Sequence, residues 1–390
     1  MSPNLSWTRR TFVSTLSLTG AAAMAGQVRS LDLATHRTGP ARAPFLAFVG
    51  FSGGAIEHRH TIESYRVKDG KWSAVSSLLA EGPRSLALHP QLPILNFAHS
   101  TAIHRNLPRG SVSSYAIDDA TGSLSHLSQQ PLALSATYTS HLAVSPDGRT
   151  LLASATGGGA YNFFTLGPDG AILSNPYPLK QTGSGPHPLQ RAARPHTALF
   201  QKASSSSYAT DLGADRLNQI AFEDAVPVVR SRLSFVPGCG PAHLLLHPSG
   251  ELLLVANRFR PAISLVPVDA ASGDLRSPLE HYPLGTYLAG PIALSNAGDR
   301  VYATGIQRNG RTIVSVFALA HRVGKLRLIQ QTPIDAIAAP EQLLRHDDEL
   351  LFVGAAGVVG LPIAQRTGLL GEPKVAILKG GAASLAVRTT

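Results

Sequence analysis

The chain repeats one strand–turn–strand template six times, and this repetition limits its possible folds more than any other feature. Each copy has an alternating apolar segment, a polar turn and a second apolar segment, as in "HLAVSPDGRTLLASA" from His141 and "HLLLHPSGELLLVAN" from His243. The other copies start at Ser85, His196, Pro291 and Gln342, the last two in weaker form. The starts lie roughly 45 to 56 residues apart, within or slightly above the period of propeller blades.

A third and a fourth alternating segment follow the template, as in "RLNQIAFE" from Arg216 and "TIVSVFALA" from Thr312. Four strands per repeat make one propeller blade. The segment from Phe45 supplies two or three strands of a further blade, and the C-terminal "KVAILKGGAASLAV" can supply what that blade lacks. The sequence therefore predicts an all-β fold: a seven-bladed β-propeller of four-stranded antiparallel blades, formed by residues 43–390 as a single domain and closed by both chain ends.

Composition agrees with this fold and narrows the partners. A chain with 44% hydrophobic and 15% charged residues, 36 glycines and 28 prolines is typical of a globular protein with many short strands and turns. The net charge of +10 includes no dense basic run with interleaved aromatic residues, so we expect no nucleic-acid partner. Cys239 is the only cysteine, which excludes an intramolecular disulfide, and the flanking Gly238 and Gly240 predict a tight turn there. We expect no cofactor and no obligate protein partner.

Residues 1–25 have the pattern of a twin-arginine export signal. Arg9 and Arg10 precede Phe12 and a weakly apolar run, which ends in a small-x-small site at Ala23 and Ala25. The run is too short, and too rich in glycine and threonine, for a transmembrane segment. The sequence predicts an exported protein, periplasmic or extracellular; the alternative is a basic N-terminus of a cytosolic protein.

The first strand of each propeller blade lines the central channel, so the residue just before its apolar run is expected at the channel mouth. This rule places six residues at equivalent positions: Ser85, His141, His196, His243, Pro291 and Gln342. Three successive blades thus present a histidine. The imidazoles could share a small ligand, a bound water or a metal ion, or each could simply cap its strand and bond to a neighbouring loop. The sequence leaves these alternatives open, although no acidic cluster favours calcium.

Longer motifs resemble a known family. "PHTALF…ATDLGADRLNQIAFE" and "GCGPAHLLLHPSGELLLVANRF" are similar to the seven-bladed propeller lactonases, which include bacterial 6-phosphogluconolactonases and a fungal muconate-lactonizing relative. The resemblance spans essentially the whole chain after the expected signal. Its most specific part is "DLGADR", from Asp211 to Arg216, with Gln190 and His196 upstream.

The resemblance also shows departures from the family pattern. The family has R-Q-x-x-P-H-x-H before the "DLGADR" strand pair; His196 matches the second histidine, whereas Arg194 replaces the first. The family's G-P-R-H in the next blade becomes Gly-Pro-Ala-His, so the histidine, His243, remains without the arginine. Two family N-E pairs become His99–Ser100 and Asn257–Arg258. Of the family's suspected arginine, glutamate and histidine set, only the histidine matches.

The implied function is hydrolysis of a sugar-derived or other small lactone at the channel mouth, without a metal. The resemblance implies a general base at His196. The rest of the expected catalytic set, His243 and Arg258, is rearranged relative to the family, with His141 and Arg84 as the alternative partner and cationic donor. The residues expected to bind a lactone or sugar-acid ligand are Gln190, His141, Arg84, Asp211 and Arg216. The alternative is a non-catalytic exported propeller that binds a small anionic ligand or a protein partner on the same face; the missing arginine and glutamates favour it, whereas the retained histidines and Gln190 favour the enzyme.

Overall fold

The computed structural model describes residues 43–52, 60–173, 175–201, 206–269, 271–334 and 340–389. The chain divides into two units, residues 1–41 and 42–390, and the strands of the described residues belong to the second. The expected export signal, residues 1–25, lies outside the described residues.

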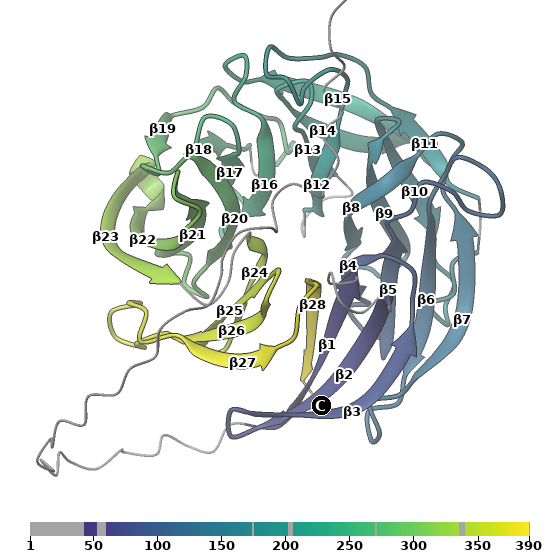
Figure 1. The fold of residues 1–390 in the computed structure, drawn as a ribbon. Coiled ribbons are helices and arrows are strands. Elements are labelled where there is room, and N and C mark those ends of the chain that lie inside the picture. The colour runs from purple at the N-terminus through teal and green to yellow at the C-terminus, as the bar shows by residue number, and fades with distance from the viewer. Residues whose placement is uncertain are drawn as a thin grey trace, which may run out of the picture. The chain divides into compact units, whose positions relative to one another are not determined.

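The second unit is a ring of seven four-stranded antiparallel sheets, the blades (Figure 1). The strands of each blade are given below from the innermost outwards. This arrangement confirms the predicted seven-bladed all-β propeller. Blade 1 comprises β28 (Ala382–Thr389), β1 (Phe45–Ser52), β2 (His60–Lys68) and β3 (Lys71–Leu79). Blade 2 comprises β4 (Pro83–Leu88), β5 (Ile94–His99), β6 (Ser111–Ile117) and β7 (Leu124–Pro131). Blade 3 comprises β8 (Thr137–Val144), β9 (Thr150–Gly157), β10 (Ala160–Thr165) and β11 (Tyr177–Lys180).

The remaining blades follow the chain in order. Blade 4 comprises β12 (Pro195–Phe200), β13 (Ser207–Asp211), β14 (Arg216–Glu223) and β15 (Val226–Ser234). Blade 5 comprises β16 (Pro241–Leu246), β17 (Leu252–Asn257), β18 (Ala262–Pro267) and β19 (Glu280–Pro283). Blade 6 comprises β20 (Leu288–Leu294), β21 (Arg300–Ile306), β22 (Thr312–Ala320), the short 3₁₀ turn η2 (His321–Val323) and β23 (Lys325–Ile334). Blade 7 comprises β24 (Pro340–His346), β25 (Glu349–Gly354), β26 (Gly357–Pro362) and β27 (Lys374–Leu378).

Both chain ends close the ring in blade 1, as the sequence predicted. The C-terminal β28 is the innermost strand of that blade and pairs antiparallel with the N-terminal β1, from Phe45 opposite Thr389 to Gly50 opposite Ser384. The inner-strand position that the N-terminal segment leaves open is therefore filled from the other end of the chain. Closure of this kind leaves no unfilled gap between blades where another chain could insert.

The hydrophobic core is divided among the seven junctions between blades. Each of seven clusters of buried apolar residues combines side chains from two neighbouring blades. At the junction of blades 3 and 4, for example, Tyr161 and Phe163 pack with Ala209 and Ile220. Because a fully buried large apolar side chain contributes about 1.5–3 kcal/mol, these junctions hold the ring together.

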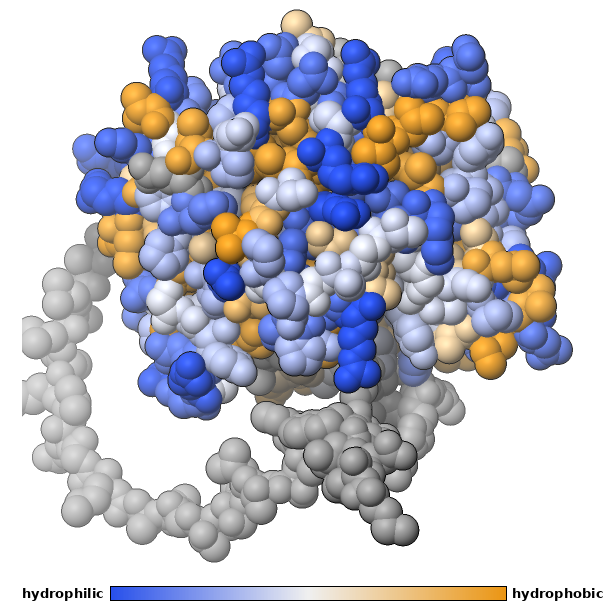
Figure 2. All heavy atoms as spheres, turned by 90° about the horizontal axis from the view of Figure 1, so that it is seen from above, coloured by the Kyte–Doolittle hydropathy of each residue, from blue (hydrophilic) through white to orange (hydrophobic). Residues whose placement is uncertain are grey.

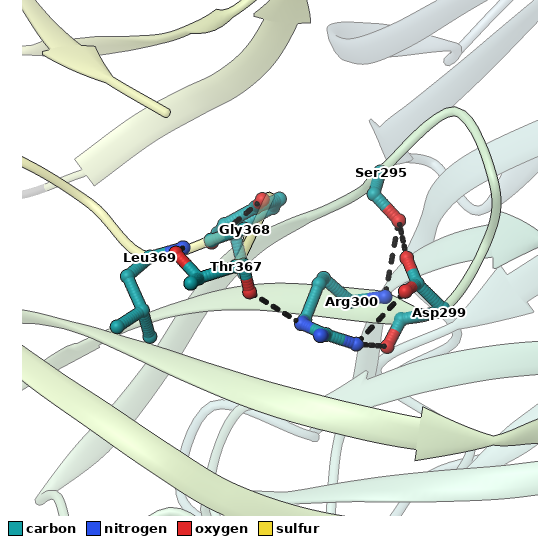
Figure 3. Close-up of polar contacts among 7 residues, drawn as sticks. Ser295, Asp299, Arg300, Thr367, Gly368 and Leu369 are labelled. Atoms are coloured by element: carbon teal, nitrogen blue, oxygen red, sulfur yellow. Dashed lines mark hydrogen bonds and ion pairs between the residues drawn. The ribbon is translucent and has the colours of Figure 1, made fainter. Parts of the chain in front are cut away.

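Polar contacts also join neighbouring blades. One set lies at the end of the ring where the innermost strand of each blade turns into the next strand. Arg300, at the start of β21, donates from Nε to the Thr367 carbonyl 2.9 Å away and from Nη1 to Asp299 Oδ2 at 2.9 Å (Figure 3). Asp299 also accepts from Ser295 Oγ at 2.8 Å. These bonds fix a turn of blade 6 against a loop of blade 7. They lie at the opposite end of the inner strands from the predicted mouth.

Among the residues that the structure covers, no helix is long and apolar enough to cross a bilayer. Hydrophilic and hydrophobic side chains are interspersed on the side of the molecule seen in Figure 2. Exposed large apolar residues include Leu79 on the outer strand β3, which is 72% exposed.

Candidate functional site at the channel mouth

Every innermost strand carries an irregularity at the same level, near its start. The pairing of β4 with β5 skips Arg84, that of β8 with β9 skips Ser140, and that of β24 with β25 skips Glu341. The corresponding skipped residues in the other inner strands are Ala242 in β16, Ala383 in β28, the pair His196–Thr197 in β12 and the pair Gly290–Pro291 in β20. A β-bulge bends its strand and re-aims the extra side chain, so each blade offers one bulge residue to the mouth.

This register corrects the predicted equivalence of the three histidines. Pro195 lies opposite Asp211 just as Pro241 lies opposite Asn257, and the next common pairs are at Ala198 and Leu244. By this count His196 is equivalent to Ala242, Arg84 and Glu341, whereas Thr197 is equivalent to His141 and His243. The sequence comparison was wrong by one residue in blade 4 because the polar Thr197, and not an apolar residue, follows His196.

The position after the bulge mainly connects blades. Ser85 Oγ accepts a hydrogen bond from the Leu142 backbone N–H at 2.9 Å, and Gln342 Oε1 accepts one from the Leu385 N–H at 2.7 Å. His141 does the same in blade 3, where its Nδ1 lies 3.5 Å from the Ala198 N–H. His141 thus accepts a hydrogen bond from a backbone N–H on the inner edge of β12. This contact agrees with the alternative given above, in which each histidine bonds to a neighbouring segment and not to a ligand.

His196 has a different environment, because its imidazole reaches across to blade 5. Its Nδ1 lies 3.2 Å from the carbonyl oxygen of Ala242 and 3.2 Å from Thr197 Oγ1. The carbonyl can only accept, so this contact requires a proton on Nδ1, and in that tautomer Nε2 carries the lone pair. The His196 and His243 rings meet edge to face, with centroids 5.1 Å apart. His196 and His243 are therefore neighbours although they belong to different register positions.

Burial keeps these imidazoles neutral. It lowers the pKa of His196 to about 3, with further contributions from the nearby Arg258 guanidinium and His141. Burial likewise lowers the pKa of His141 to about 4 and that of His243 well below its usual value. At neutral pH His196 can therefore accept a proton at Nε2 but carries no charge of its own.

The mouth also carries two arginines and a carboxylate. Arg84 Nη2 and Glu341 Oε2 form an ion pair at 2.6 Å that joins blades 2 and 7 past the small Ala383 of blade 1. Arg258 follows β17 and is largely buried; its pKa is lowered by that burial, while Glu341 acts in the opposite direction. Within the described ranges, the Arg258 guanidinium makes no hydrogen bond or ion pair, so it is a cation available to a ligand.

Arg258 is held in place from the "DLGADR" turn. The Asp215 carboxylate accepts hydrogen bonds from the Gly240 N–H at 2.8 Å and the Gly238 N–H at 2.7 Å. The Gly240 carbonyl in turn accepts from the Arg258 N–H at 2.7 Å. The motif in blade 4 therefore fixes the loop of blade 5 that presents the free guanidinium.

Three residues expected to bind substrate make hydrogen bonds in or beside this turn, although Asp211 Oδ2 is buried without a hydrogen-bond partner among the described residues. Gln190 is fully buried and donates from Nε2 to the Leu212 carbonyl at 2.8 Å and to Asp215 Oδ1 at 2.7 Å. Asp211 Oδ1 accepts from three backbone N–H groups, the shortest bond being 2.7 Å from Arg194, and burial raises its pKa. Arg216 Nη1 donates to the Thr182 carbonyl at 2.8 Å. Their predicted contact with substrate remains a prediction.

Glu341 is the mouth residue that sequence reasoning did not select. The signal was present, because Glu341 precedes an apolar inner-strand run as Arg84 does. Cys239 lies in the expected turn, where its Sγ donates to Asp215 Oδ1 at 3.6 Å and burial raises its pKa. Across the described part of the chain, no three His, Cys, Asp or Glu side chains are grouped so that they could hold a metal ion.

Below the Arg84–Glu341 pair, the channel wall opens into a cavity of about 250 Å³. Residues of β4, β24 and β28 line it, and four of the nine are leucines. Its titratable residues, Arg345 and His346, lie at the far ends of their strand. The polar groups suited to chemistry are thus concentrated at the mouth.

The fold and these groups together define a seven-bladed propeller with a cationic, histidine-lined channel mouth. Residues 52–377 match the family described as "Lactonase, 7-bladed beta-propeller", and the chain belongs to this family. The resemblance inferred from the sequence motifs is therefore confirmed.

Individual relatives agree with this assignment. The chain is 25% identical over 228 residues to the 6-phosphogluconolactonase of Bacillus subtilis, covering 57% of this chain and 64% of that protein. It is 25% identical over 236 residues to the 6-phosphogluconolactonase of Pectobacterium carotovorum, covering 58% and 66%. The matched region thus spans less than two thirds of these relatives' length.

Solved structures share the fold. A periplasmic gluconolactonase of Pseudomonas aeruginosa superposes with a TM-score of 0.78 at 18% identity, covering 89% of this chain and 99% of that one. A protein from Lactobacillus plantarum gives a TM-score of 0.77 at 18% identity, covering 88% and 99%. At this identity the likeness describes the fold alone.

Proposed function

We propose that the protein is an exported lactonase that hydrolyses a small anionic lactone at the channel mouth. The observation that carries this proposal is the free Arg258 guanidinium beside the neutral His196, in a mouth walled by protein. A desolvated cation attracts a carboxylate or phosphate strongly, and the imidazole next to it supplies a proton acceptor.

The reaction uses His196 as general base. Its Nε2 takes a proton from a water molecule while the water oxygen bonds to the lactone carbonyl carbon. The resulting tetrahedral oxyanion needs hydrogen-bond donors, for which the neutral imidazole of His243 and the guanidinium of Arg258 are available. When the ring C–O bond breaks, His196 returns the proton to the departing ring oxygen, and the product is the open hydroxy acid.

The depressed pKa of His196 has a direct consequence for this step. Burial makes the imidazole a weak base, and the Arg258 and Arg84 cations oppose its protonation further. An anionic substrate paired with Arg258 reduces this repulsion and so raises the His196 pKa, although the effect of burial remains. Substrate charge would then improve catalysis as well as binding, so neutral lactones should react more slowly.

The type of lactone is the finer part of the proposal. The curated relatives are named 6-phosphogluconolactonases, which favours a sugar-derived lactone. The export signal expected in residues 1–25 favours an unphosphorylated acid, because phosphorylated sugar intermediates are kept in the cytosol. We therefore place the reaction in the periplasm or outside the cell.

The test is hydrolysis by the purified protein that begins after residue 25. Acid release is measured with a panel of sugar and aliphatic lactones, with and without a carboxylate. We expect His196→Ala to lower kcat by at least about 100-fold, whereas His126→Ala, an exposed histidine on β7, serves as the matched control. Absence of activity on the whole panel, or activity unchanged in His196→Ala, would leave the non-catalytic propeller as the better description.

A further inference from the structure

Two loops beside the mouth present large apolar side chains to solvent. Residues 101–110 connect β5 to β6, and residues 132–138 lead from β7 into β8; both lie at the mouth end of their strands. Four backbone hydrogen bonds join the loops, including Ser135 N–H to the Pro108 carbonyl at 2.8 Å. The exposed side chains are Ile103 (63%), Leu107 (41%), Leu134 (64%) and Tyr138 (53%), which we call the mouth patch.

Tyr138 occupies a backbone position that is glycine in three other blades. The residue two places before the bulge residue is Gly82 in blade 2, Gly240 in blade 5 and Gly381 in blade 1, with φ of 52°, 62° and 86°. In blade 3 this residue is Tyr138, with φ of 53°. A bulky side chain is disfavoured in the left-handed region, and such strain is typically kept where the side chain has a task.

The same two loops contain more of this strain. Of the nine non-glycine residues with positive φ in the described ranges, four lie here: Arg105, Asn106, Ser135 and Tyr138. The cross-loop hydrogen bonds hold these residues in place. The patch is thus a preformed apolar surface, which binds a ligand without first having to become ordered.

The patch adjoins the proposed catalytic groups. Tyr138 is two residues before Ser140, a distance of about 7 Å along a strand. Ser140 Oγ donates to the His196 carbonyl oxygen at 2.7 Å. Tyr138 and His196 thus lie on the neighbouring inner strands β8 and β12 at the same end of the ring, so a ligand at the mouth that extends over blade 3 meets the patch.

We propose that the mouth patch binds an apolar substituent of the substrate, so that the preferred lactone carries an alkyl or aryl group in addition to its anionic group. This assignment rests on the proposed lactonase function and specifies its substrate class. The charged end pairs with Arg258, and the apolar end covers the side chains of the patch. Each substrate methylene removed from water contributes about a three- to fourfold preference.

The experiment compares two lactones that share a ring and a carboxylate, one of which also carries a butyl chain. For the wild-type protein we expect kcat/KM to favour the butyl lactone by about tenfold or more. Tyr138→Gly and Leu134→Ser should each lower this ratio by about fivefold. Leu79→Ser, which removes an equally exposed leucine from the outer strand β3, should leave the ratio unchanged.

Several outcomes would overturn the assignment. One is a wild-type kcat/KM ratio near one, and another is an equal loss of kcat/KM for both lactones in Tyr138→Gly. The third is a dimer in sedimentation that Leu134→Ser dissociates, since the patch would then bind a second copy. If the wild-type protein hydrolyses neither lactone, the proposed function fails by itself. Calorimetric binding of the two open hydroxy acids then tests the patch separately, and equal affinities for both would reject it.

Discussion

Asp215 offers a direct test of how the "DLGADR" turn supports the site, through the variant Asp215→Gly. The Asp215 carboxylate accepts from Gln190 Nε2 at 2.7 Å and from the Gly238 and Gly240 N–H groups at 2.7 and 2.8 Å. The residue has φ of 52°, which glycine adopts without strain, so this substitution removes the acceptor and adds no backbone cost.

The size of the loss follows from those three donors. A buried donor left without an acceptor costs about 1–3 kcal/mol, and three of them cost about 3–9 kcal/mol. Removal of the desolvated carboxylate offsets part of this, so we expect a net loss of about 3–5 kcal/mol in the free energy of unfolding. Because Gly240 also accepts from the Arg258 N–H, KM for an anionic lactone should rise in the same variant.

Urea unfolding measures the first effect, with the slope m compared to confirm that the two transitions are alike. The matched control is Asp347→Gly, which removes another aspartate with a left-handed φ, 48°, from an exposed turn. Since water replaces the contacts of Asp347, its removal should leave the urea midpoint nearly unchanged. If Asp215→Gly shifts the midpoint no more than Asp347→Gly does, the reasoning from buried donors is refuted.

Three other predictions follow from the mouth and its surroundings. Arg258→Met should raise the urea midpoint, because it removes a desolvated cation that has no partner among the described residues. The same variant should lower kcat/KM for anionic lactones by at least about tenfold. A fall in both the urea midpoint and kcat/KM would show that the guanidinium is structural. The free energy of unfolding should decrease as pH falls from 6.5 to 4, because His99, His141 and His196 bind protons in the unfolded chain but not in the folded one. Urea midpoints measured across this range give the slope of stability against pH. His141→Gln should reduce that slope by the equivalent of about one proton. Cys239 should react with a thiol reagent only after unfolding, since it is buried and its pKa is raised; rapid labelling of the native protein would contradict this.

The blades could be predicted from sequence because their determinants are local and repeated. Alternating apolar residues define each strand, and polar turns define its ends. Closure by β28 and β1 also followed, since the segment from Phe45 supplied too few strands for a complete blade. The division of the core into seven junctions needs no further information, because each blade buries both faces against its neighbours.

The mouth could be predicted only in part, because bulges are not visible in a hydrophobic pattern. Each bulge adds one residue to an inner strand, and in blade 4 the polar Thr197 follows His196, so the position of His196 was assigned one place too far along. The substrate contacts expected of Gln190, Asp211 and Arg216 remain predictions, because the hydrogen bonds of these residues are to the protein itself.

The ring also suggests how a site of this kind can change its residues while the fold stays the same. Each blade places one bulge residue at the same level of the channel, so a guanidinium or carboxylate reaches the mouth from any blade. In this chain blade 2 supplies Arg84 and blade 7 supplies Glu341, whereas the family pattern has the arginine in blade 5 and the glutamates in blades 2 and 5, where this sequence lacks them. The expected set is thus absent from its usual positions, although groups of the same chemistry are present. For a closed propeller, the composition of the bulge ring is therefore a better guide to the chemistry of the mouth than the identity of any single aligned position.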